Sequence, residues 1–185
     1  MNPILRDFPD AFETERLRIR CPLPGDGAVV NAAIRESIDR LRPWLPWATP
    51  TPTPDETESL CRRSRARWLE RSDLPLFLFR RDTGEFVGGS GLHRIDWNVP
   101  KLEIGYWIRT ACEGQGLMTE AVAGITGWAF ETLGARRVEI RCDPRNTRSR
   151  AIPVRLGFTH EAILRNDARD VDGALRDTEI FARVR

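Results

Sequence analysis

The segment that most constrains the fold of this chain joins a predicted strand to a predicted helix through a loop with two glycines. Leu102 to Ile108 is apolar and β-prone, whereas residues 117–133 repeat apolar side chains at helical spacing. Between them, Gly114 and Gly116 allow a tight turn and a close approach of the backbone to a ligand. Unpaired amides and the dipole at the start of such a helix predict a site that suits an anionic phosphate.

Two common phosphate-binding loops do not match this segment. It lacks the Gly-Lys-Ser/Thr ending of a Walker A loop, and it does not follow a first strand as the G-x-G-x-x-G of a dinucleotide-binding fold does. Nucleoside triphosphates and dinucleotides are therefore disfavoured as ligands. A Gly-x-Gly pair alone is more often only a turn, so the assignment depends on the surrounding sequence.

The N-terminal part of the chain predicts one strand followed by two helices. Residues 15–21 alternate arginines with apolar side chains, which is the period of a half-buried strand. Asp26 can cap a first helix that ends near residue 42. After a proline-rich loop, Thr53 and Glu56 form a capping box that opens a second helix through about residue 70.

The remaining segments predict a mainly antiparallel sheet. Two β-prone runs at 74–81 and 85–93 form a hairpin, and the strand at 102–108 is their next antiparallel neighbour. The later elements are a strand at 138–142, a short helical segment before Gly157, and two closing strands around 162–164 and 179–181. This order predicts an α+β fold, a mixed α/β arrangement of helices around a mainly antiparallel central sheet.

Composition limits the classes of protein that the chain can belong to. Its 185 residues suit one domain, 1–185, and the formal charge of +2 gives no general nucleic-acid footprint. No segment approaches the roughly 20 apolar residues that span a bilayer, and the N-terminus is not a signal peptide. The four cysteines are widely separated, which argues against zinc and disulfides. We expect a soluble cytoplasmic protein with no metal and with reduced thiols.

The segment from Glu103 to Ala121 resembles the acetyl-CoA motif of the GNAT superfamily of N-acetyltransferases, most closely the RimJ/RimL type that acetylates ribosomal proteins. Three further blocks in the same order support the resemblance: residues 13–20, residues 42–47, and Asn146-x-x-Ser149 followed by Leu156-Gly157-Phe158. The resemblance implies a GNAT-like sheet of about seven strands with about four helices, splayed between its fourth and fifth strands. It also implies acetyl-CoA as co-substrate.

The resemblance also assigns residues to the cofactor. Pantetheine would lie in the splay against the main chains of Trp107, Ile108 and Arg109, and Asn146 would reach its arm. The family loop often starts with Gln or Arg, where this chain has Ala111, so affinity could be lower. The diphosphate would lie on the amides of Gly114, Gln115, Gly116, Leu117, Met118 and Thr119.

Three side chains are candidates for the chemistry. Glu103 is the leading base, although an ordinary glutamate pKa of about 4.3 requires burial or a relay water, and a plain salt bridge is the alternative. Ser149 is the candidate acid, or merely a helix-cap hydroxyl. His93 could line the acceptor cleft or relay a proton, or be structural.

The choice of Ser149 as acid follows from a departure from the superfamily pattern. Many members carry a tyrosine acid where this chain has Pro153, and the sole tyrosine, Tyr106, lies elsewhere in the sequence. The proline also predicts that its helix starts late, near Ser149, or is kinked. Trp44, Trp47 and Trp97 could wall the acceptor site, although tryptophans in such loops more often cover the edge of the core.

The acceptor remains the least constrained part of this interpretation. An α-amine has a pKa of roughly 7.7–8.0 against about 10.4 for lysine, so a modestly equipped site favours N-termini of proteins or peptides. We expect transfer by direct attack in a ternary complex. The alternatives are a small-molecule amine acetyltransferase, such as one acting on an aminoglycoside-type antibiotic, and a non-catalytic acyl-CoA-binding protein. A homodimer is possible, and no membrane or nucleic-acid partner is expected.

Overall fold

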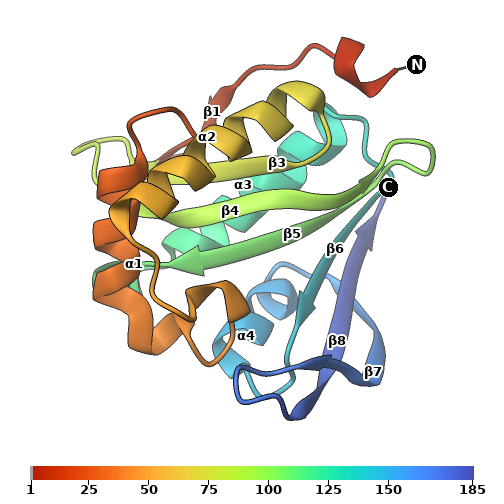
Figure 1. Ribbon diagram of the computed structural model, residues 1–185. Coiled ribbons are helices and arrows are strands. Elements are labelled where there is room, and N and C mark those ends of the chain that lie inside the picture. Colours follow the sequence, from red (N-terminus) through yellow and green to blue (C-terminus); the bar gives the residue numbers. More distant parts are fainter. Residues whose placement is uncertain (1) are drawn as a thin grey trace.

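A single open sheet organises the computed structural model, which describes residues 2–185 (Figure 1). In this part of the chain the strand order is β1-β2-β3-β4-β5-β6-β8-β7, and every neighbouring pair is antiparallel except β5 and β6. The strands are β1 (Ala11–Glu13), β2 (Leu17–Arg20), β3 (Leu74–Arg80), β4 (Phe86–Asp96), β5 (Lys101–Ile108), β6 (Arg137–Cys142), β7 (Thr159–Arg169) and β8 (Leu175–Val184).

Helices cover both faces of this sheet. In Figure 1, α2 crosses in front of β3 and β4, and α3 lies behind them. The side chains of β3 to β5 alternate between these faces, so one set packs with α1 and α2 and the other with α3. The helices are α1 (Gly27–Leu41), α2 (Pro54–Glu70), α3 (Leu117–Glu131) and α4 (Thr147–Arg155), with short 3-10 turns η1 (Pro3–Leu5), η2 (Pro46–Ala48) and η3 (Thr110–Cys112).

The predicted α+β class, with its mainly antiparallel sheet and four helices, is confirmed. The sheet of residues 2–185 has eight strands where about seven were expected, and the additional one is the edge strand β1, which pairs with β2. With three residues, β1 is too short to show a strand period in the sequence. The run β3-β4-β5 is antiparallel as expected. The one parallel pair follows from α3, because parallel strands need a crossover connection of this kind.

The parallel pair β5 and β6 separates soon after it begins. Lys101 pairs with Arg137, Leu102 with Val138 and Glu103 with Glu139, and no pair follows in the described residues. Both strands continue, β5 to Ile108 and β6 to Cys142, so they diverge as a V that is visible in Figure 1. The splay expected between the fourth and fifth predicted strands therefore opens directly beyond Glu103.

Asp26 is the N-cap residue of α1 as expected, but its side chain makes no capping hydrogen bond. Its carboxylate instead accepts hydrogen bonds from both terminal nitrogens of Arg20, each at 2.7 Å, and from the amide of Leu23. The two parallel bonds to the guanidinium form a bidentate pair, which holds the carboxylate away from the first turn of the helix. The amides near the start of α1, at Gly25 and Gly27, donate to Glu58 of α2.

The close contact between α1 and α2 depends on a glycine. A Cβ added at Gly27 would lie 2.6 Å from the Cα of Glu58, so Gly27→Ala should force the two helices apart and destabilise the fold by roughly 1–3 kcal/mol. Gly127→Ala is the matched control, since a Cβ there meets nothing within 4 Å and should stabilise α3 by about 0.5–1 kcal/mol. Denaturant unfolding measures both; equal effects of the two substitutions would contradict this account.

Candidate active site

The mouth of the splay is bordered by the glycine loop on one side and by α4 on the other. Gly114 and Gly116 have φ angles of 74° and 76°, in the left-handed region that favours glycine. Gly116 is the N-cap residue of α3 and has no side chain to accept a hydrogen bond. The backbone amides of the first turn are therefore not capped by the N-cap residue. Leu117 and Met118 bury their side chains in the core, which fixes the start of the helix. This geometry suits an anion such as a diphosphate.

The start of the loop is fixed to α1. The guanidinium of Arg109 pairs with Glu36 at 2.6 Å and with Glu85 at 2.8 Å, and the hydroxyl of Ser37 accepts the amide of Thr110. The amide of Arg109 donates to the carbonyl of Val87, 2.9 Å away. The main-chain N–H of Arg109 is therefore already used within the sheet, and only its carbonyl is left as a candidate for pantetheine.

The end of the loop is held by arginines that the sequence interpretation did not single out. Arg16 donates to the carbonyl of Gln115 and pairs with Glu120 in the first turn of α3 at 2.6 Å. Arg80 contacts the side-chain oxygen of Gln115, whose nitrogen donates to the carbonyl of Ala111. The side chain of Gln115 therefore stabilises the loop, and a ligand would be bound by the backbone amides of the loop.

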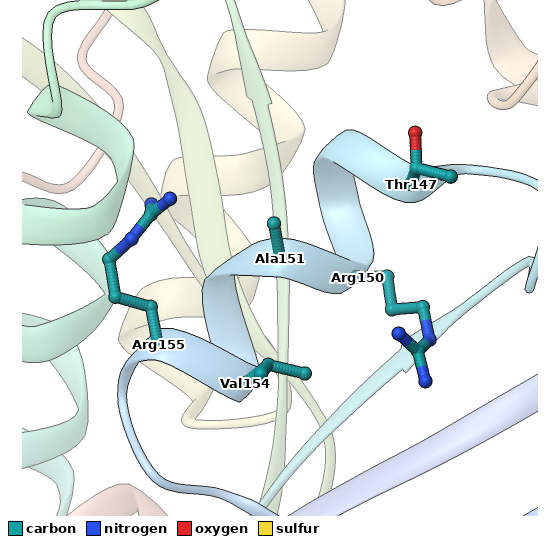
Figure 2. Close-up of a pocket in the computed structure, with 5 residues that line it drawn as sticks. All are labelled: Thr147, Arg150, Ala151, Val154 and Arg155. Atoms are coloured by element: carbon teal, nitrogen blue, oxygen red, sulfur yellow. The ribbon is translucent and has the colours of Figure 1, made fainter.

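The opposite wall is α4, which is linked to the loop by charged side chains. Arg148 forms an ion pair with Glu113, and Arg155 donates to the hydroxyl of Thr119 at 3.1 Å. Figure 2 shows Arg155 pointing towards α3 and Arg150, which pairs with Glu179, pointing the other way. A pocket of about 370 Å³ on this helix is lined by Thr147, Arg150, Ala151, Val154 and Arg155.

Tyr106 lies next to Ser149, which the sequence interpretation did not anticipate. Its hydroxyl donates to the carbonyl of Ser149 at 2.9 Å and accepts from the Ser149 hydroxyl at 3.2 Å. Pro153 explains why that carbonyl is free, because proline lacks the N–H that would bond the residue four positions earlier. Burial raises the pKa of Tyr106. A tyrosine from β5 therefore reaches the helix in which the superfamily tyrosine is missing.

The first turn of α4 also corrects one expectation. The helix starts at Thr147 and contains Pro153, so the expected late start is wrong. Asn146 is the N-cap, and its side-chain oxygen accepts the amide of Ser149 at 3.1 Å. That early cap is sufficient to start the helix ahead of the proline. The oxygen of Asn146 is thus occupied, and only its NH₂ group is a candidate for contact with pantetheine.

Glu103 lies at the point where the strands diverge, on the sheet face opposite Tyr106. Its side chain is 18% exposed, and its Oε2 is buried without a hydrogen-bond partner in the described residues. Arg94 lies 3.3 Å and Arg141 4.0 Å from that oxygen, within ion-pair range but outside hydrogen-bond geometry. Burial raises the pKa of Glu103, and the two arginines oppose this without reversing it. The carboxylate is therefore more basic than an ordinary glutamate.

The structure brings one further predicted residue to this face. His93 is the cross-strand partner of Glu103 in the pair β4 and β5, and its Nδ1 lies 2.7 Å from Asp73. On the same face Trp107 packs edge-on against Trp47 of η2, with ring centroids 6.0 Å apart. The two faces of the splay thus differ: Glu103 and His93 lie on the side of α1 and α2, and Tyr106 and Ser149 on the side of α4.

Comparisons with known proteins agree with this geometry. The family model described as an acetyltransferase (GNAT) domain matches residues 16–159. The chain is 31% identical over 172 residues, 92% of each chain, to the Bacillus subtilis protein named "Putative ribosomal N-acetyltransferase YdaF". It is 29% identical over 107 residues, 58% of each chain, to the ribosomal-protein-serine acetyltransferase of Escherichia coli. The structure of Mycobacterium smegmatis RimJ in complex with CoA-disulfide superimposes with a TM-score of 0.83 at 28% identity, covering 91% of this chain and 81% of that one.

Within residues 2–185, no helix combines the length and the apolar character that crossing a bilayer requires.

Proposed function

This chain belongs to the GNAT acetyltransferase family, and on that premise we propose that it acetylates the N-terminal α-amine of a protein or peptide, with acetyl-CoA as donor. It is an N-acetyltransferase, and the finer question is which amine it modifies. Two relatives carry names that refer to ribosomal proteins, which supports a protein N-terminus as acceptor. We further propose that it works as one domain, 1–185, in the cytoplasm.

The loop and the splay fit the donor substrate. The diphosphate of acetyl-CoA would lie on the amides between Gly114 and Thr119, and the pantetheine would follow the free edge of β5 towards Glu103. The amide donors and the glycines in the left-handed region suit the diphosphate. The unpaired edge of β5 suits the pantetheine, because its amides can hydrogen-bond to this edge as an added strand would. The thioester would then lie between the two faces of the splay.

Transfer requires a neutral amine and a proton for the departing thiolate. Glu103 would accept the proton of the incoming amine, whose nitrogen then attacks the thioester carbonyl in a ternary complex. Ser149 would supply a proton as the carbon–sulfur bond breaks. The Ser149 hydroxyl donates a hydrogen bond to the Tyr106 hydroxyl, 3.2 Å away. For acid catalysis the Ser149 O–H would have to rotate from Tyr106 towards the sulfur as the thiolate forms.

One observation carries the proposal most strongly: the buried Oε2 of Glu103, which accepts no hydrogen bond from the described residues, lies where β5 and β6 separate. A hydrogen-bond acceptor left unpaired in the interior is costly unless a ligand or water completes it. Its raised pKa suits the removal of a proton from an α-amine near neutral pH. A lysine amine, with its pKa of about 10.4, would present a far smaller neutral fraction to such a base.

A thiol-release assay across three amine classes tests the proposal. The acceptors are a lysine-free peptide with a free N-terminus, the same peptide N-terminally blocked and carrying one lysine, and an amino sugar. We expect kcat/KM for the free N-terminus to exceed that for lysine by roughly a hundredfold, from the difference in neutral fraction. Turnover of the amino sugar alone would favour a small-molecule acetyltransferase. Tight acetyl-CoA binding without turnover of any amine would favour a binding protein.

A further inference from the structure

We infer that Asp73 is a positioning residue that fixes the tautomer of His93, and that His93 carries the proton of the acceptor amine from Glu103 to solvent. The inference rests on the proposed function and adds to it a proton exit and a residue outside the family motifs. Asp73 lies in the turn between α2 and β3, outside the four blocks of sequence that carry the resemblance to the superfamily.

The contact between Asp73 and His93 decides which imidazole nitrogen is basic. Oδ1 of Asp73 lies 2.7 Å from Nδ1 of His93, and the carboxylate is 18% exposed. An ionised carboxylate accepts hydrogen bonds only, so Nδ1 must carry the proton. In the neutral imidazole Nε2 is then the free acceptor, as in catalytic aspartate–histidine pairs.

Two glycines leave the space that the imidazole occupies beside the sheet. Gly91 and Gly105 face each other across β4 and β5. A Cβ at Gly91 would lie 2.6 Å from Cε1 of His93, and one at Gly105 would lie 3.1 Å from its Cδ2. A side chain at either glycine would displace the imidazole from its position over Gly91 and Gly105. The ring therefore has a fixed place beside Glu103 as well as a fixed tautomer.

The stoichiometry of the reaction requires such an exit. An ammonium group has three N–H protons; as the N–C bond forms and the C–S bond breaks, the amide keeps one and the thiol of CoA gains one. The third must reach water. Glu103 is 18% exposed and His93 37% exposed, so the cross-strand pair leads from a buried acceptor outwards to solvent. Histidine suits this transfer because its charge changes near neutral pH.

The charged groups around His93 are consistent with a relay. Asp73 faces it from the α2–β3 turn, Glu103 from β5, and Arg94 follows it in β4. Arg67 of α2 lies 3.8 Å from the second oxygen of Asp73. Two carboxylates, those of Asp73 and Glu103, thus flank the imidazole.

Nitrogen NMR of the histidine rings tests the positioning without any turnover. The chain has two histidines, so the His160→Gln variant assigns both sets of signals. We expect neutral His93 in the wild type to carry its proton on Nδ1, and Asp73→Asn to lose that preference. An unchanged tautomer in Asp73→Asn would overturn the inference, whatever the acceptor proves to be.

Turnover tests the relay, with the peptide acceptor that the wild type acetylates fastest. Asp73→Asn and His93→Ala should each lower kcat by about tenfold or more and leave the Kd for acetyl-CoA unchanged, whereas His160→Gln should match the wild type. Added imidazole should restore turnover of His93→Ala, because this variant leaves the space over Gly91 and Gly105 empty. Added pyrrole, which has no basic nitrogen, should not restore turnover. Wild-type kcat in Asp73→Asn, or equal rescue by pyrrole, would overturn it.

The failure of this inference can be told from the failure of the proposed function. If the wild type acetylates no peptide, the proposed function fails, and the tautomer of His93 still decides the role of Asp73. If peptides are acetylated and Asp73→Asn is as fast as the wild type, the proposed function stands and the proton exit does not.

Discussion

Glu103→Gln should lower kcat by about 10²–10⁴-fold and leave the Kd for acetyl-CoA unchanged, because general base catalysis by a placed carboxylate is worth that much. Glutamine keeps the shape of the side chain and cannot accept the proton. The raised pKa of Glu103 also sets the pH dependence. In the wild type kcat/KM should rise with pH as Glu103 ionises, above the ordinary range of a glutamate, and the variant should lose that rise.

The matched control for this substitution is Glu139→Gln. Glu139 is the partner of Glu103 in β6, and its carboxylate is already bound by Arg137 at 2.5 Å. We expect kcat of this variant within about twofold of the wild type, since the same change then falls on a carboxylate with its own partner. Equal losses in both variants would show that charge in this region, and not base catalysis by Glu103, matters.

Protein stability separates loss of catalysis from misfolding in the Glu103 variant. Burial raises the pKa of Glu103 in the folded state, so the folded protein binds the proton more tightly than the unfolded chain. The stability that this group contributes is fully present below its unfolded pKa and is lost as pH rises through the folded value. Glu103→Gln should therefore unfold at a higher temperature at neutral pH, with the difference shrinking towards acid pH. A lower Tm at neutral pH would contradict this.

Gly116→Val should weaken acetyl-CoA binding by roughly 10²-fold or more. A β-branched residue at a φ of 76° is strained by about 1–3 kcal/mol, and relief of that strain moves the first-turn amides of α3. The loss of two hydrogen bonds to a charged diphosphate, at about 1.5–3 kcal/mol each, accounts for an effect of this size. Titration calorimetry with CoA measures it.

Gly134→Val is the control for backbone strain. Gly134 follows the other end of α3, has a φ of 70°, and a Cβ there meets nothing within 4 Å. It should destabilise the protein about as much as Gly116→Val and leave the Kd for CoA unchanged. If both variants bind CoA equally weakly, general destabilisation explains the loss and the loop does not hold the diphosphate.

Local sequence patterns predicted most of the fold. The helix that opens at Leu117 begins where predicted because the glycines and the apolar period mark both sides of the boundary. The capping box at Thr53 and Glu56 is present, with the Thr53 hydroxyl accepting the amide of Glu56 at 3.2 Å. Such signals are local: residues three or four positions apart meet in any helix, so tertiary contacts are not needed to interpret them.

The misjudged features depend on contacts that no helical or strand period shows. The carboxylate of Asp26 makes no capping bond because it pairs with Arg20, the last residue of β2. Tyr106 was set aside because no period or spacing connects it with Ser149, 43 residues away. The strand β1 is stabilised by its pairing with β2 and by Phe12, which stacks on Trp128 of α3 at 5.0 Å. In each case a contact across the fold outweighed the local preference.

The sequence alone determined the helices, the longer strands and the glycine loop before α3, because neighbouring residues specify them, and four blocks in the same order as in the family determined the resemblance. The tertiary structure decided how the chemistry is arranged. It separates β5 from β6 beyond Glu103, buries one carboxylate oxygen of Glu103 that accepts no hydrogen bond within residues 2–185, and places Asp73 against Nδ1 of His93. These features depend on burial and on pairs of atoms that meet only when the sheet has formed, and burial is what makes a carboxylate basic.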